Sequence, residues 1–145
     1  MINTLDLQSS VESLRQLTVQ LSGDAQGFID NLNLPKVPEY EKVQSRKVLY
    51  DGYSTVVEVS NALSKWLGKD IELDIQASGL RRAVRNSSVP PSIMKDLFNR
   101  LDDSKDLLRS VRDLIESKKY AVDNELRFYQ SVQYILGSPR LNDLE

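Results

Sequence analysis

The chain has 145 residues and a formal net charge of -2, with 40% hydrophobic and 28% charged residues, which is typical of one soluble globular domain. It contains neither histidine nor cysteine, which excludes Ser-His-Asp and Cys-His catalysis, disulfides and the usual zinc and haem ligand sets. The slightly negative charge gives no bulk attraction to nucleic acid or anionic lipid.

Residues 4–33 have the pattern of a first helix. Apolar residues recur at steps of three and four, at Leu7, Val11, Leu14, Leu17, Leu21, Phe28 and Leu32. Gly23 and Gly27 interrupt this pattern, and each costs about 1 kcal/mol relative to alanine in a helix interior. Either the helix breaks near residues 22–24, or the two glycines allow a neighbouring helix to approach closely. We favour the break.

A connector with two prolines, residues 31–38, leads to a second predicted helix over residues 38–67. Proline disfavours the helical conformation of the residue before it, so the connector should be extended. Pro38 suits the first position of the second helix, and Gly68 suits the position just past its end. Gly52 lies inside this helix and weakens the prediction.

Residues 70–86 fit two patterns. Ile71, Leu73 and Ile75 alternate with acidic residues, which is typical of a strand, but a single strand has no partner within the chain. The steps from Ile71 through Ile75, Leu80 and Val84 fit a helix, and Asp70 could cap its first turn. We therefore predict a third helix here, followed by a loop at residues 86–91.

The stretch from Ser92 to Leu136 contains no glycine and no proline, and its apolar residues keep helical spacing throughout. Charged pairs four residues apart, such as Arg112 with Glu116, indicate its solvent side. Lys118 falls on an apolar position, so a bend at residues 116–119 competes with a continuous helix. We favour continuity.

Together these patterns predict an all-α fold: an elongated four- to five-helix bundle of the coiled-coil type, with a long C-terminal helical spine. Residues 1–145 are expected to form one domain, in which 137–145 are a polar tail. No apolar run approaches the length that crosses a bilayer, and the N-terminus lacks the basic and apolar regions of a secretion signal. A cytoplasmic protein without membrane contact is expected.

The end of the spine is broadly apolar, which is typical of a contact surface. We predict that Phe128, Tyr129, Val132 and Tyr134 form a protein interface and that the chain self-associates through it. Ordinary core packing is the alternative explanation for these side chains.

Two charged clusters are further candidates. Arg81, Arg82 and Arg85 could grip phosphate or nucleic acid, or could merely complement the negative end of a helix dipole. Three acidic side chains could hold Mg²⁺ with waters, but a solvated helix face with Lys105 and Arg109 as basic partners is the better explanation: Asp102, Asp103 and Asp106. We predict the structural explanation for both clusters, with no metal and no cofactor.

The function expected from the sequence is non-catalytic. We expect a helical interaction protein that acts as a subunit, adaptor or self-assembling building block of a larger complex, with protein partners and homo-oligomers. The alternative is a coat, packaging or regulatory protein that binds nucleic acid through Arg81, Arg82 and Arg85.

Overall fold

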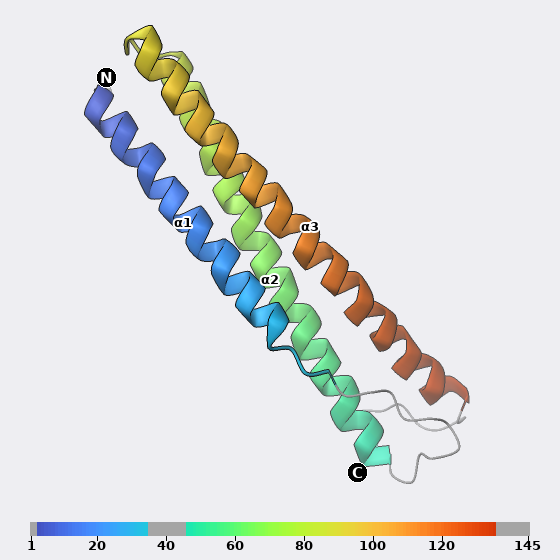
Figure 1. Ribbon diagram of the computed structural model, residues 1–145. Helices are drawn as coiled ribbons and strands as arrows, with labels where there is room; N and C mark the ends of the chain where they lie inside the picture. Colours follow the sequence, from blue (N-terminus) through green and yellow to red (C-terminus); the bar gives the residue numbers. More distant parts are fainter. Residues whose placement is uncertain (1–2, 35–45, 136–145) are drawn as a thin grey trace. The chain divides into compact units, whose positions relative to one another are not determined.

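A computed structural model describes residues 3–34 and 46–135, and within the second range the side chains of residues 46–49 and 132–135 are not described. Three α-helices make up most of these residues: α1 (Thr4–Asp30), α2 (Arg46–Arg85) and α3 (Pro91–Ile135) (Figure 1). The helices have 27, 40 and 45 residues and together make up more than two-thirds of the chain. The described ranges contain no strand. The all-α prediction is confirmed.

The buried residues of each helix repeat with the seven-residue period of a coiled coil. In α2 the fully buried positions lie seven residues apart, at Val56, Leu63, Asp70, Ala77 and Val84. In α1 and α3 the buried positions alternate steps of three and four, as in the series Leu97, Leu101, Ser104, Leu108, Val111 and Ile115. This 3.5-residue spacing keeps one seam of each helix facing its neighbours.

The predicted number of four to five helices is wrong, because the described residues form three. From Arg46 on, the predicted helices over 38–67 and 70–86 are one helix that passes through Gly68. The end of the predicted connector and the predicted start of the second helix at Pro38 fall in residues 35–45, which lie outside the described residues. The buried series continues across that glycine, and packing along a seam contributes more than the helix propensity of one residue. The break expected in α1 is also wrong, since α1 is continuous through Gly23 and Gly27. The prediction of one continuous helix through residues 116–119 is confirmed.

The chain divides into two compact units: Met1–Asp30 with Trp66–Ile115, and Asn31–Lys65 with Glu116–Glu145. We call them unit 1 and unit 2. Helices α2 and α3 contribute a segment to each unit, so the expectation of one domain stays a prediction. The polar tail, 137–145, lies outside the described residues.

In unit 1, α1 packs against the second half of α2 and the first half of α3. Its apolar core draws on all three helices, with Leu7, Val11, Leu14, Ala77, Val84, Val89, Leu97 and Leu101. Glu12 of α1 lies 3.5 Å from Arg100 of α3, and the Phe28 ring of α1 lies 6.1 Å from the Trp66 ring of α2. These contacts hold α1 along both other helices.

In unit 2, the first half of α2 packs against the second half of α3. Tyr129 is buried here, and its ring lies directly over Gly52. Asp123 accepts hydrogen bonds from Lys119 Nζ and Ser60 Oγ, both at 2.8 Å. The Lys119 hydrogen bond is the main reason that the pKa of Asp123 lies below its ordinary value. This contribution to stability is therefore present near neutral pH and is lost as the pH falls through the lowered pKa.

Candidate interaction groove

A polar layer interrupts the apolar seam between α2 and α3 of unit 1. Asp70 is 0% exposed, and its Oδ1 accepts a hydrogen bond from Nε of Arg112 at 3.0 Å and lies 3.0 Å from Nη2 of the same guanidinium in an ion pair. Nη2 of Arg112 also lies 3.5 Å from Oδ2 of Asp74, while Lys105 donates to Ser78 Oγ at 2.8 Å. These side chains occupy the α2–α3 seam, and the opposite edge of α2 is left to face α1.

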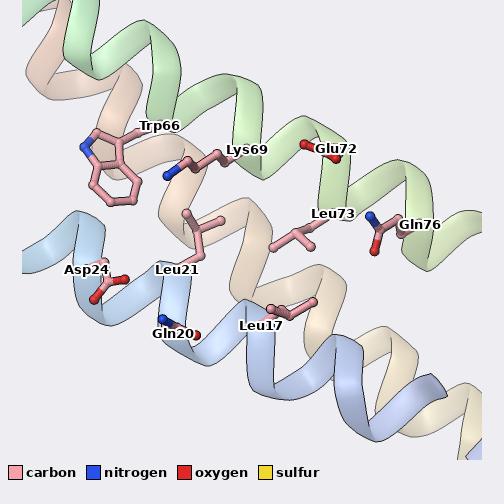
Figure 2. A pocket seen from close by; sticks show the side chains of 9 residues that line it. All are labelled: Leu17, Gln20, Leu21, Asp24, Trp66, Lys69, Glu72, Leu73 and Gln76. Carbon is pink, nitrogen blue, oxygen red and sulfur yellow. The ribbon is translucent and has the colours of Figure 1, made fainter. Parts of the chain in front are cut away.

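That opposite edge borders a groove between α1 and α2 of unit 1. One part of the groove has a volume of about 310 Å³ (Figure 2). From α1 it is lined by Leu17, Gln20, Leu21 and Asp24, and from α2 by Trp66, Lys69, Glu72, Leu73 and Gln76. The lining therefore combines four apolar side chains with five polar or charged ones.

A second hollow of about 490 Å³ shares Leu17 and Gln76 with the first and extends the groove toward the N-terminus of α1. Its other lining residues are small or apolar: Ser9, Ser10, Ser13, Leu14, Gly79 and Leu80. Small side chains allow the backbone of a neighbouring helix to approach closely. The two hollows together follow about four turns of each flanking helix.

The groove is open because α1 covers only part of the α2 seam. Trp66, Leu73 and Leu80 recur every seven residues on α2, yet each is only half-buried. At one end the Trp66 ring contacts Phe28, and Lys69 Nζ lies 4.7 Å from the centre of the same ring. Such a cation–π contact orients the indole toward the groove. Leu73 and Leu80 pack partly against the apolar core, and the edges of this half-buried row that remain exposed are a preformed surface onto which a further helix could pack.

The predicted arginine cluster is only partly available for binding. Arg81 forms an ion pair with Asp102 of α3 and lies 4.8 Å from the centre of the Phe98 ring. It thus links α2 to α3. Arg82 and Arg85 are exposed in the last turn of α2, where positive charge complements the helix dipole. Arg81 therefore has a structural role between two helices, whereas Arg82 and Arg85 remain exposed at the end of α2.

Replacing Arg81, Arg82 and Arg85 together by alanine tests the phosphate hypothesis. If all three contacted a DNA duplex, affinity would fall by about 0.9 log units per log unit of salt for each phosphate neutralised, and the triple variant would lose most of that slope. We expect no gel shift at low salt with the wild type and a lower melting temperature in the variant. Alanine at Arg81 alone should reproduce most of the stability loss, because only Arg81 bridges two helices.

The residues of the predicted C-terminal interface also differ in their exposure. Phe128 is exposed and free to contact a partner, whereas Tyr129 is buried against α2. Burial, with a smaller contribution from Glu125, raises the pKa of Tyr129, so its phenol stays neutral near pH 7. The side chains of Val132 and Tyr134 lie outside those described. An interface that includes Tyr129 would need the contact with Gly52 to open.

The acidic cluster is dispersed among basic partners. Asp102 pairs with Arg81, and Asp106 lies 3.7 Å from Arg109. Within residues 3–34 and 46–135, no three carboxylates converge as they would around a metal ion. None of the helices in those ranges combines the length and apolar character of a membrane-spanning segment.

No sequence motif indicates the groove, because Leu17, Trp66 and Leu73 are apolar residues of the kind that also fill the core. The one available signal for the groove is the heptad pattern of α1. That pattern places Leu17 beside the buried seam rather than in it. The chain matches no protein-family model, and comparison with curated proteins and with solved structures found no match.

Proposed function

We propose that this protein is a non-catalytic helical interaction module, a subunit or adaptor, that binds an amphipathic helix of a protein partner in the groove between α1 and α2. The observation that carries the proposal is the half-buried row of Trp66, Leu73 and Leu80 along the groove, opposite the exposed Leu17. A helix with apolar residues every seven positions matches that row. The absence of histidine and cysteine from the sequence favours binding over catalysis.

The rim of the groove also favours a helical partner. Asp24 lies on one wall, and Lys69 and Glu72 lie on the other, so charges of both signs flank the apolar floor. A partner helix that carries paired acidic and basic residues beside its apolar stripe could satisfy these groups, which would fix its direction and register. The nucleic-acid alternative has less support, because Arg81 is already paired with Asp102.

Two substitutions on α1 test the groove. Leu17 is 48% exposed and lines the groove, whereas Val19, which is 54% exposed, does not line it. Both residues should accept glutamate without loss of folding. Proteins captured from the native source by the wild type and by Val19→Glu should be lost with Leu17→Glu, because the new charge would be buried under the bound helix. Quantitative mass spectrometry of the three captures gives the comparison.

Equal capture by Leu17→Glu and Val19→Glu would show that partners do not bind in the groove. Circular dichroism of all three proteins is the control, since each should keep the helical spectrum of the wild type.

A further inference from the structure

The apolar seam between α2 and α3 of unit 1 does little to fix their register, which is the alignment of α3 along α2. The buried series of α3 repeats after seven residues, so a shift of one heptad puts Leu101 where Leu108 lies and Leu108 where Ile115 lies. An apolar side chain replaces an apolar one at both places, and the same side of each helix still faces the other. Apolar packing alone therefore distinguishes poorly between the observed register and those one heptad to either side.

The short loop between the helices disfavours one of these two shifts. Arg81 of α2 pairs with Asp102 of α3, and by extension the end of α2 at Arg85 is level with residue 98. Helix α3 begins seven residues earlier, about 10 Å beyond the end of α2. A shift of one heptad farther outward would double this offset to about 20 Å. The loop, residues 86–90, reaches only about 20–22 Å when fully extended, which leaves almost nothing for the separation of about 8–10 Å between the helix axes.

The opposite shift brings the two helix ends level, so the loop permits it, but Arg81 disfavours it. In the observed register Arg81 pairs with Asp102 and lies 4.8 Å from the centre of the Phe98 ring. After the shift, the residues seven positions earlier in α3 take these places, and Arg81 faces Lys95 and Pro91. An ion pair and a cation–π contact are thus replaced by a contact between like charges.

The buried ion pair disfavours the same shift. Arg112 faces Asp70 in the observed register and would face Leu63, one heptad earlier on α2, after the shift. Asp70 would then face Lys105, so the carboxylate would keep a basic neighbour. The guanidinium of Arg112 would exchange a carboxylate for an apolar side chain, which costs free energy at a half-buried position.

We infer that Arg81 determines the register of α3 on α2 in unit 1. Loop 86–90 disfavours the shift in one direction, and the pair of Arg112 with Asp70 adds to the effect of Arg81 in the other. The register also determines where α1 can pack, because the apolar core beneath α1 draws on residues of both α2 and α3. The inference does not depend on what the groove binds.

Cysteine cross-linking measures the register directly, because the chain contains no cysteine. Ser60 of α2 donates a hydrogen bond of 2.8 Å to Asp123 of α3, so Ser60→Cys/Asp123→Cys should form a disulfide in the observed register. After the shift Glu116 takes the place of Asp123, so Ser60→Cys/Glu116→Cys reports the shifted register. One heptad corresponds to about 10 Å, which is farther than a disulfide spans. On mild oxidation of the otherwise wild-type chain, only the first pair should form a disulfide.

Charge reversal at Arg81 should change the register. In Arg81→Glu the new carboxylate repels Asp102 in the observed register and attracts Lys95 in the shifted one. The initial rate of disulfide formation by the shifted pair, divided by that of the observed pair, should therefore rise at least about tenfold. Arg82→Glu is the matched control and should leave this ratio unchanged, because Arg82 is exposed and, among the described residues, forms no ion pair with α3.

A full exchange of charges should restore the observed register. The variant Arg81→Glu/Asp102→Arg/Lys95→Glu has opposite charges in the observed register and like charges in the shifted one, so the ratio should return to its wild-type value. Circular dichroism should show the same helicity in every variant.

Three results would overturn the inference: an unchanged ratio in Arg81→Glu, an equal rise in Arg82→Glu, or no return in the exchanged variant. If Arg81→Glu lost its helical structure, Arg81→Ala would take its place. Alanine removes the contacts of Arg81 without adding a charge, so the ratio should rise by a smaller factor, about threefold. A ratio equal to that of the wild type would again overturn the inference.

Discussion

Replacing Arg112 by leucine is expected to lower the free energy of unfolding by about 3–5 kcal/mol, one of the largest effects of any single substitution in this chain. Asp70 is fully buried at a seam position of α2, where its Oδ1 accepts a hydrogen bond from Nε of Arg112 and forms an ion pair with Nη2. Removing the guanidinium leaves a buried carboxylate without its opposite charge. The cost of desolvating that carboxylate is then no longer offset.

Urea denaturation at neutral pH measures this effect as a shift of the midpoint at constant m-value. Arg109→Leu is the matched control, because Arg109 lies one turn away and, among the described residues, forms an exposed pair with Asp106 that is worth at most about 1 kcal/mol. The double variant Asp70→Leu/Arg112→Leu should recover most of the loss, since apolar residues can replace a buried ion pair at little cost. Equal losses from Arg112→Leu and Arg109→Leu would contradict the role assigned to the buried pair.

The sequence pattern alone does not predict the pairing of Asp70 with Arg112. From the sequence, Asp70 was expected to cap a helix, and Arg112 was expected on the solvent side beside Glu116. Both expectations used neighbours within one helix, whereas the two residues are 42 positions apart in the chain. Local periodicity cannot show a contact between helices. Because Asp70 was not recognised as a seam residue, Ile71 and Ile75 were assigned to the apolar stripe in its place.

The same limit explains the helix count. Helical spacing alone identified almost all of the helical residues correctly, because the steps of three and four are a property of each segment. Gly68 and the pair Gly23 and Gly27 were interpreted as breaks on the strength of propensity. Seam packing over 40 residues of α2 and 27 of α1 outweighs costs of about 1 kcal/mol for each glycine.

The candidate sites were predictable only in part. Exposure of Phe128 and of Arg82 follows from their positions outside the buried series, so the sequence could indicate them. The pairing of Arg81 with Asp102 and the burial of Tyr129 depend on which helix lies opposite. The groove depends on how far α1 covers the row of Trp66, Leu73 and Leu80, and no feature within α2 alone determines that.

Gly52→Ala is expected to destabilise the protein by about 1–3 kcal/mol, although alanine is the better helix former by about 1 kcal/mol. A Cβ atom added at residue 52 would lie 2.8 Å from Cζ of Tyr129 and closer still to its hydroxyl oxygen. Tyr129 is buried, so its ring has little space into which it can move. Either the ring leaves its rotamer or α2 and α3 separate locally, and both changes cost packing energy.

Gly68→Ala is the matched control and should stabilise the protein rather than destabilise it. Residue 68 is exposed in the interior of the same helix, and an added Cβ atom meets nothing within 4 Å, so the gain in helix propensity of about 1 kcal/mol should appear undiminished. Thermal unfolding followed by circular dichroism would show a lower midpoint for Gly52→Ala and a higher midpoint for Gly68→Ala. If both midpoints rose, the contact between Gly52 and Tyr129 would not be tight.

Replacing Tyr129 by a shorter side chain should reverse the sign of the stability change that Gly52→Ala causes. Tyr129→Leu alone removes buried area and is expected to cost about 2 kcal/mol or more. In that background the ring no longer fills the space above residue 52, so adding Gly52→Ala should be neutral or stabilising. The loss in the double variant would then be smaller than the sum of the two single losses. Residues in contact couple by about 0.5–3 kcal/mol in such a cycle, whereas Gly68→Ala with Tyr129→Leu should add without coupling because the two residues share no contact.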